Sequence, residues 1–390
     1  MKTQRLLRAC ALTFALTFAN GIVSAATPAQ PLVQAEAITT APGVTVNGWA
    51  RGFNAPRGLK YGYWPINGYN QLHVAEGGTG GTTSTASLCK QVDPPIGPYT
   101  GSRTGGRVSV IAQTFDFPRP SRTTITDQLP SSQTSVESGS LVSGAADVAF
   151  IGSKLYVLVS GGGCSHGVPY RPNAVVRIDN GRPVLVANLS TWLRAHPGSA
   201  LGPDVEPDGT WYSMVALNGM LYLIEPNHGL FVRVNPLTGA VTQLLDVSGV
   251  FGRHVVPTAL AYHKGYFYIA NLGTFPIVDG TQRVWRVLTN PLRLQRVATG
   301  TAIVALAFDA NDAMYILQLT SGAPGPTPGM GSIVRIRPGG QPQTIVSGLT
   351  FPTGMTIAPG GRVMFVSHMG FGAPGSGEIL RVDLFPPGQP

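Results

Sequence analysis

A short pattern of apolar and polar positions recurs six times along the chain. In each copy an apolar segment ends at a turn that contains Gly, Asp or Asn, and a second segment follows in which apolar residues alternate with others. This pattern predicts two half-buried β-strands joined as a hairpin. The copies are GLKYG…QLHVAE (58–76), DVAFIGSKLYVLV (147–159), MVALNGMLYLIE (214–225), ALAYHKGYFYIAN (259–271), ALAFDANDAMYILQ (305–318) and GMTIAPGGRVMFVSH (354–368).

A third apolar segment follows each hairpin, usually with a central Arg, as in VVRID (175–179) and ILRVD (379–383). The second to fifth copies add a fourth segment, such as PVLVANL (183–189) and QTIVSGL (343–349). Four strands in each of six copies predict an all-β fold, a six-bladed β-propeller.

The sixth copy ends after its third strand, and a candidate for its missing strand lies near the start of the chain. VTVNGWARGF (44–53) has the pattern of the segment at 343–351, and precedes the first copy as that segment precedes the sixth. We therefore expect the N-terminal strand to complete the last blade and close the ring, which would remove two open sheet edges. Extra residues are expected as an insertion at 77–106, a polar stretch at 117–144 and a tail at 191–210.

The first residues have the composition of a secretory signal peptide. Lys2, Arg5 and Arg8 precede a short apolar run, and Val23-Ser24-Ala25 fits the small-residue cleavage rule. The predicted organisation is a signal peptide at 1–25, a flexible N-terminus at 26–41, one propeller at 42–385 and a tail at 386–390. We expect cleavage near Ala25 and a secreted or periplasmic protein.

The distribution of charge and the length of the apolar segments limit the classes of partner that the chain can have. The formal net charge is +9, of which three charges belong to the signal, and the basic residues are scattered rather than clustered. Scattered charge is typical of an ordinary solvated surface, so we expect no nucleic-acid partner. No later segment is long and apolar enough to span a membrane. We expect a monomer.

Two cysteines, Cys89 and Cys164, remain after the signal. Both follow the second strand of their copies, in neighbouring blades, and an even count in an exported protein favours a disulfide. Cys164 also lies in GGGCSHG (161–167), so a nucleophilic Cys164–His166 pair is a second, less favoured interpretation.

The candidate site is a ring of polar residues at one mouth of the central channel. Second strands end, and inner strands begin, at the same face of a propeller, and concave mouths are the default binding hypothesis. We predict ligand contacts from the polar strand-end residues Glu76, Glu225, Asn271, Gln318 and His368, and from the inner-strand residues Arg57 and Asp147. A structural role remains equally open for Arg57 and Asp147, because a buried Asp there can lock adjacent blades through backbone amides.

Two metals are conceivable at this ring. The oxygen atoms of Glu76, Glu225, Asn271 and Asp147 would suit calcium, and His368 with the two Glu residues would suit zinc. The segment DVEPDG (204–209) begins like a calcium loop, but Val215 occupies the position of its closing Glu.

Several motifs together resemble the ScyD/ScyE family of exported bacterial propellers, over residues 44–384. They are APRGLKYG (55–62), HVAEGGTGG (73–81), TGGRVSVI (104–111), GAADVAFIG (144–152), VVPTALAY (255–262), LTFPTGMTIAPGG (349–361) and GEILRVDL (377–384), with Cys89. The resemblance implies an NHL-like propeller and no defined reaction. The chain departs from the family pattern at Ala270–Gly273 and Glu225–His228.

Three functions remain open at this stage. The first is a non-catalytic exported propeller that binds a small molecule, glycan or protein on the face of Glu76 and His368. The second is a calcium-dependent hydrolase or lyase of the lactonase kind, with one Glu as base. The third is a scaffold in the cell envelope.

Overall fold

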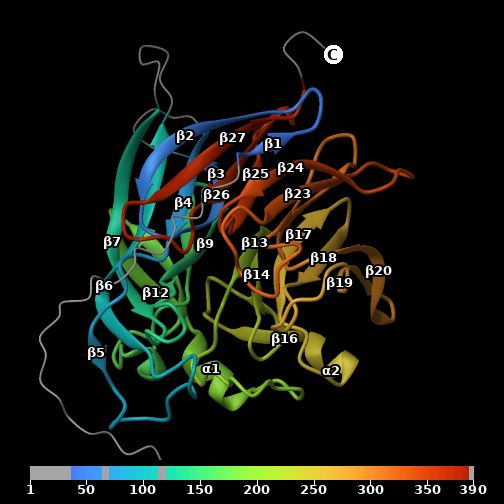
Figure 1. Cartoon of the computed structure of the whole chain (residues 1–390). Coiled ribbons are helices and arrows are strands. Elements are labelled where there is room, and N and C mark those ends of the chain that lie inside the picture. Colours follow the sequence, from blue (N-terminus) through green and yellow to red (C-terminus); the bar gives the residue numbers. More distant parts are fainter. Residues whose placement is uncertain (1–36, 64–69, 113–119, 386–390) are drawn as a thin grey trace, which may run out of the picture. The chain divides into compact units, whose positions relative to one another are not determined.

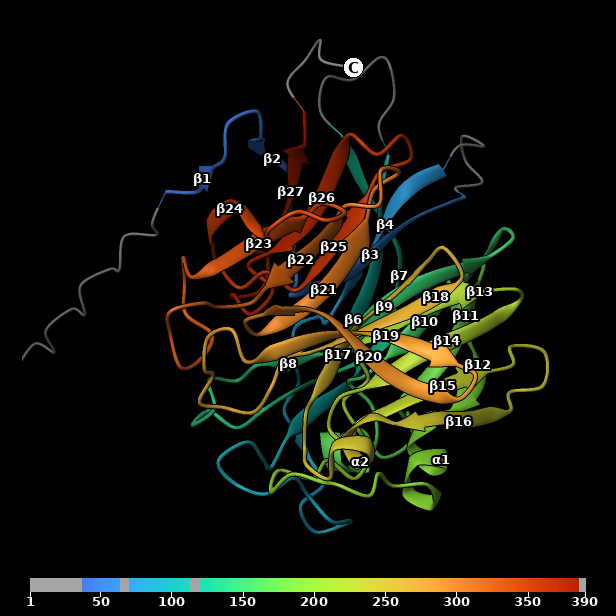
Figure 2. The same ribbon diagram turned by 90° about the vertical axis from the view of Figure 1, so that its right-hand side faces the viewer.

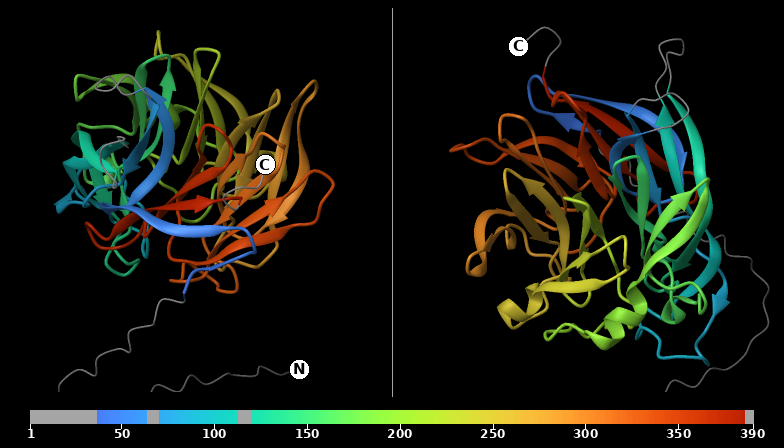
Figure 3. Two further views of the ribbon diagram at one scale, coloured as in Figure 1. Left: turned by 90° about the horizontal axis from the view of Figure 1, so that it is seen from above. Right: turned by 180° about the vertical axis from the view of Figure 1, so that it is seen from behind.

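The computed structural model describes residues 37–63, 70–112 and 120–385, and within them it confirms the six-bladed β-propeller. The predicted signal peptide and the tail at 386–390 lie outside the described residues. Each blade is an antiparallel sheet, and its inner strand contacts the inner strands of both neighbouring blades, including β25 with β3. These contacts run from the first blade round to the sixth and back to the first (Figure 1, Figure 3).

The first three blades follow in chain order. Blade 1 consists of β3 (Pro56–Tyr63), β4 (Asn70–Glu76), β6 (Thr100–Ala112), β7 (Ser121–Gln133) and β8 (Val142–Ser143), with β5 (Thr83–Ser84) paired to β6. Blade 2 consists of β9 (Ala145–Ile151), β10 (Lys154–Val159), β11 (Ala174–Asp179) and β12 (Arg182–Asn188). Blade 3 consists of β13 (Ser213–Leu217), β14 (Met220–Glu225), β15 (Leu230–Val234) and β16 (Val241–Asp246).

The last two blades include strands from the start of the chain. Blade 4 consists of β17 (Pro257–His263), β18 (Tyr266–Asn271), β19 (Gln282–Thr289) and β20 (Leu292–Gly300). Blade 5 consists of β21 (Ile303–Phe308), β22 (Met314–Gln318), β23 (Gly331–Ile336) and β24 (Gln343–Leu349), with β1 (Thr39–Thr40) at its edge. Blade 6 consists of β25 (Gly354–Ile357), β26 (Val363–His368), β27 (Gly377–Asp383) and β2 (Thr45–Phe53).

The N-terminal strand lies where the sequence pattern places it. β2 pairs antiparallel with β27, from Thr45 opposite Asp383 to Phe53 opposite Gly377. That this pairing is what holds the ring together stays a prediction. Thr39 and Thr40, assigned above to a flexible N-terminus, pair with β24 (Figure 2). The first residues of the ordered ring therefore lie before residue 42.

Blade 1 has an outer strand that the sequence pattern missed. The polar stretch at 117–144 contains β7, a strand of 13 residues paired with β6, and the expected insertion at 77–106 is shortened because β6 begins at Thr100. β7 reads SRTTITDQLPSSQ, and most of its first half is exposed. An outer strand with little apolar alternation gives no period-two signal, which explains the omission.

The core lies between the blades. Aromatic side chains fill the space between blades 3 and 4, where the rings of Phe231 and Phe267 lie 5.3 Å apart and Trp285 is buried. The space between blades 6 and 1 is filled in the same way by Trp49, Tyr61 and Phe365. Large side chains at these positions keep the wedge-shaped gaps between diverging blades packed.

In the described part of the chain, three short helices lie in the connections that enter or leave the blades. α1 (Leu189–Ala195) begins just before the tail predicted at 191–210 and runs into it, and the Asn188 side chain caps it by accepting from the Thr191 N–H at 2.9 Å. α2 (Val247–Phe251) is capped in the same way by Asp246, and η1 (Cys164–His166) follows β10. Figure 1 shows α1, α2 and β5 at the same end of the blades. Within the described residues, no helix has the length and apolar character needed to cross a membrane.

Candidate functional site

The polar residues that end the second strands share one structural task. Each bonds to the backbone segment that leads into the inner strand of its own blade. Glu76 accepts from Asn54 N–H, Glu225 from Thr210 N–H, Gln318 from Thr301 N–H and His368 from Thr350 N–H, whereas Asn271 donates to the Val255 carbonyl. In blade 2, where Val159 ends the strand, the backbone of Ser160 bonds to Gly144 instead. We call these contacts the strand-end clasps.

Among the clasp residues, Glu76 accepts the most hydrogen bonds. Its side chain is fully buried, and it accepts from Asn54 N–H at 2.8 Å and from the Ser109 hydroxyl at 2.5 Å. Arg107 donates to it through Nε at 2.8 Å and through Nη2 at 2.5 Å. The carboxylate of Glu76 therefore has four donors, and each oxygen is in use within blade 1.

Glu225 is also fully buried, among backbone N–H groups. It accepts from Thr210 at 2.7 Å, from Asn227 at 3.2 Å and from His228. Burial raises the pKa of Glu225, and the nearby His228 and these N–H donors oppose that rise. A raised pKa is a property of general bases, but this carboxylate is held by the chain on both oxygens.

The other three clasps use neutral groups or an imidazole. Asn271 also accepts from Arg283 N–H at 2.8 Å, and Gln318 also donates to Ser332 Oγ at 2.8 Å. In His368, Nε2 accepts from Thr350 N–H at 2.8 Å, and Nδ1 lies 3.7 Å from Glu378. The sequence prediction that these five residues gather at one face agrees with their places in the blades. Their polar atoms, however, are hydrogen-bonded to the protein itself, except for Nδ1 of His368.

Residues near the start of four inner strands bond to the next blade. Asp147 in blade 2 accepts from Met214 N–H of blade 3 at 2.8 Å. Three hydroxyl groups make the reverse kind of bond and donate to a carbonyl of the next blade. They link Ser213 to Thr258 at 2.7 Å, Thr258 to Ile303 at 2.6 Å, and Thr353 to Pro56 at 2.6 Å. Asp147 thus has the blade-locking role that the sequence left open.

Arg57 and Asp147 are both buried charges close to the channel. Arg57 donates to the Val142 carbonyl, and its guanidinium carbon lies 4.5 Å from the centroid of the Phe371 ring. Burial lowers the pKa of Arg57. Burial raises the pKa of Asp147, although Lys60 Nζ, 3.3 Å from both carboxylate oxygens, opposes the rise. Each charge is partnered, as buried charges require.

The channel at this position has little free space. A cavity of about 30 Å³ is lined by Lys60, Asp147 and Tyr212 among others, which is room for about one or two water molecules. Tyr212, from the segment before β13, reaches blade 6 and donates to the Thr353 carbonyl at 2.9 Å. Burial raises its pKa to about 12. An organic ligand does not fit in this cavity, and Tyr212 was not among the residues predicted.

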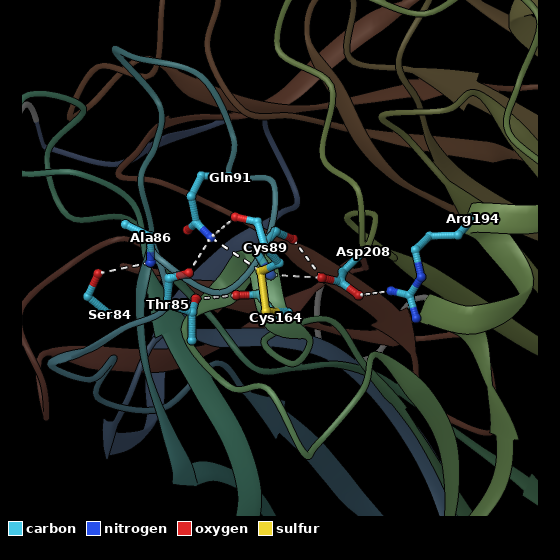
Figure 4. Close-up of a disulfide and its surroundings, with 9 residues drawn as sticks. Ser84, Thr85, Ala86, Cys89, Gln91, Cys164, Arg194 and Asp208 are labelled. Atoms are coloured by element: carbon cyan, nitrogen blue, oxygen red, sulfur yellow. Dashed lines mark hydrogen bonds and ion pairs between the residues drawn. A yellow bond between two sulfur atoms is a disulfide. The ribbon is translucent and has the colours of Figure 1, made fainter.

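The insertions of blades 1 and 2 are joined by the predicted disulfide. Cys89 and Cys164 are bonded, and the Thr85 hydroxyl donates to the Cys164 carbonyl beside them (Figure 4). The alternative of a nucleophilic Cys164–His166 pair is wrong, because Cys164 is the disulfide partner. His166 Nδ1 lies 3.0 Å from Ser132 Oγ instead.

Around the disulfide lies a buried polar cluster that the sequence did not predict. Its members are Tyr99, Ser132, His166, Glu206 and Asp208. His166 Nε2 is 3.3 Å from Glu206, and Glu206 accepts from the Tyr99 hydroxyl at 2.9 Å. The Ser–His–Glu succession resembles a catalytic relay in composition. Ser132 is fully buried, however, so a substrate cannot reach its hydroxyl in this structure.

The surroundings of both carboxyl groups in the cluster lower their pKa. Burial alone would raise the pKa of Glu206, but the nearby His166 and the hydrogen bond from Tyr99 outweigh burial and hold that pKa below its usual value. The pKa of Asp208 is lowered against burial in the same way by Ser165, which donates through N–H at 2.9 Å and through Oγ at 2.7 Å. Arg194 of α1 adds a bond to Asp208 at 2.8 Å (Figure 4). The segments GGGCSHG and DVEPDG supply most of the cluster, so their unusual composition was the available signal.

The predicted metal sites are not assembled. Within residues 37–63, 70–112 and 120–385, no three His, Cys, Asp or Glu side chains are grouped so as to hold a metal ion. The proposed calcium ligands Glu76, Glu225, Asn271 and Asp147 come from four different blades and are each bonded to backbone. His368 likewise bonds to Thr350 rather than joining the two Glu residues as a zinc site.

No protein-family model and no curated protein sequence matches the chain. Solved structures match it at the level of fold. A putative oxidoreductase (glucose dehydrogenase) from Thermus thermophilus has a TM-score of 0.51 at 16% identity, covering 87% of this chain and 100% of that one. The PQQ-bound aldose sugar dehydrogenase from Streptomyces coelicolor has a TM-score of 0.51 at 13% identity, covering 88% and 99%. At such identities the likeness shows a shared β-propeller fold and nothing about activity.

Proposed function

We propose that the protein is an exported binding propeller of the ScyD/ScyE type, with its ligand surface on the loop face. The loop face is the face on which the second strands end, and it carries the insertions of blades 1 and 2, from Gly77 to Tyr99 and from Ser160 to Asn173. The ligand is a small molecule, a glycan or a protein. This surface replaces the channel itself as the contact region, because the channel cavity is too small for an organic ligand.

One observation carries the proposal: the loops on this face are fixed in place. The polar groups beneath these loops already form hydrogen bonds within the blades. The Cys89–Cys164 bond and the buried polar cluster fix the insertions of blades 1 and 2 to each other and to blade 3. A surface that is rigid before binding loses less conformational entropy when a partner arrives. Extended loops held by such bonds are typical of binding sites on rigid scaffolds.

The alternative is a calcium-dependent hydrolase or lyase of the lactonase kind, acting on the same face. The raised pKa of Glu225 is the observation that favours it. In that mechanism Glu225 would have to give up backbone donors before it could act as a base or bind calcium. The two functions therefore differ in whether calcium binds and whether Glu225 is needed for turnover.

A thermal-shift screen with the mature protein tests the binding function. The panel contains oligosaccharides and small organic molecules, and a ligand at a hundred times its Kd stabilises the fold by about 2.7 kcal/mol. Leu88, 67% exposed in the blade 1 insertion, is replaced in L88D. Its matched control is L237D, because Leu237 is 89% exposed in the β15–β16 turn at the opposite face. We expect a ligand that stabilises wild type and L237D and stabilises L88D less.

The hydrolase is tested beside it with calcium and a panel of lactones. If calcium raises the melting temperature and lactone turnover disappears in E225Q, the protein is an enzyme and the binding proposal is wrong. A ligand that stabilises L88D as strongly as L237D would place the contact surface elsewhere and contradict the proposal as well.

A further inference from the structure

A cleft of about 300 Å³ lies between blades 1 and 2, away from the channel. Its walls come from β7 of blade 1, from β11 and β12 of blade 2, and from the loop that precedes β11. The channel cavity measures about 30 Å³, so this cleft has roughly ten times its volume. About 300 Å³ is the lower end of the range for small-molecule pockets.

The cleft exists because small side chains line a gap that large ones fill elsewhere. Blades diverge outward, so the space between them needs bulky residues to stay packed, and Phe231 of β15, Phe267 of β18 and Trp285 of β19 supply them between blades 3 and 4. Between blades 1 and 2 the corresponding walls include Pro130, Ala174 and Pro183. These residues have no flexible side chain that could fold into the space and close it.

The walls are mainly apolar, with one charge. Leu185 is 57% exposed although it lines the cleft, and Tyr170 at its edge is 81% exposed. Arg171 is half-buried, and among the described residues that line the cleft no other carries a charge. No described side chain forms an ion pair or hydrogen bond with its guanidinium. A half-buried, unpaired guanidinium favours an anion, and a carboxylate matches its two parallel donors.

We propose that this cleft binds a small amphipathic carboxylic acid. The apolar body lies against Leu185 and the prolines, and the carboxylate pairs with Arg171. The site is distinct from the loop face of the proposed function, and the inference holds whether or not the loop face binds a ligand. The net positive charge of the chain also favours the approach of an anion.

Octanoate is a suitable probe, and octanol is its matched neutral analogue. Isothermal titration of the mature protein should give saturable binding of octanoate at one site, and octanol should bind about tenfold more weakly because it lacks the charge-assisted pair. In R171Q the two probes should bind alike. In R182Q, which changes an exposed Arg on β12 outside the cleft, octanoate should keep its advantage.

A second variant tests the cleft without removing the charge. L185W places a large ring at an exposed position in the opening, so it should fold normally, keep its melting temperature and lose octanoate binding. The proposal is overturned if octanoate does not saturate, if R171Q and R182Q behave alike, or if L185W binds octanoate as wild type does. A peptide acid, acetyl-Leu-Leu, is the competing occupant. If it binds more tightly than octanoate and depends on Arg171, the cleft receives a protein C-terminus and the free-acid proposal is wrong.

Discussion

Replacing Glu76 by Ala should destabilise the whole propeller. The substitution removes the acceptor of Asn54 N–H and Ser109, and it leaves Arg107 without its partner. The Arg107 side chain is 16% exposed and that of Glu76 is fully buried, so water does not readily replace the lost carboxylate. Removing one member of a buried ion pair costs about 3–5 kcal/mol, because the other charge is left buried and unpaired.

The expected loss is therefore about 3–5 kcal/mol in the free energy of unfolding, a large share of the roughly 5–15 kcal/mol of a typical domain. E76Q should lower the free energy of unfolding by less, because the amide oxygen of its side chain can still accept from Asn54 N–H. Urea unfolding followed by tryptophan fluorescence measures both variants, and a shift in midpoint at unchanged slope reports stability alone. D179N is the matched control, because Asp179 pairs with Arg177 at the surface and its loss should be much smaller.

The reasoning is refuted if E76A lowers the free energy of unfolding by no more than D179N does. It would mean that the four donors around Glu76 do not hold the blade. The carboxylate would then be available to a ligand or metal ion, as the sequence first suggested.

Three other features of the fold lead to predictions of the same kind. The C89S variant should be about 4 kcal/mol less stable than wild type, because the disulfide joins residues 75 positions apart and closes a long loop in the unfolded chain. Urea unfolding without reductant measures this difference, and an unchanged midpoint would contradict the prediction. Asp208 has a folded-state pKa below its usual value, so its stabilisation is complete above a pH of about 3.9 and is lost as the pH falls through the folded pKa. Acid unfolding monitored by circular dichroism should therefore be shallower in D208N than in wild type. Deleting residues 40–53 should lower the melting temperature of the whole propeller in a single transition. An unchanged melting curve would show that β2 is dispensable.

The sequence predicts the fold well because blades repeat. Each hairpin carries the period-two pattern and a Gly, Asp or Asn turn, so the six inner pairs of strands are recognisable and the disulfide follows from the neighbourhood of two loops. β7 was missed because its first half is polar and exposed, and only its pairing with β6 defines it. Local pattern therefore predicts strands that have a buried face, and it fails for an outer strand as polar as β7.

The sequence placed the polar residues at the ends of strands, but it did not predict the contacts that their side chains make. Sequence order correctly places Glu225 and His368 at strand ends, yet it does not show that each accepts a backbone N–H from the segment preceding the inner strand. Nothing in the sequence connects His166 with Glu206, which are 40 residues apart and meet at 3.3 Å. Such contacts depend on loop geometry, which has no periodic signal.

The pairing of β2 with β27 has a consequence for the order of events during synthesis. Thr45 and Asp383 are 338 residues apart, so the first long strand leaves the ribosome long before its partner exists. Pairings of this range are slow to form, and unpaired edges attract other chains in the meantime. A nascent chain halted before β27 would carry β2 as an orphan. Such a chain would expose the edge of β2 to pairing with other chains.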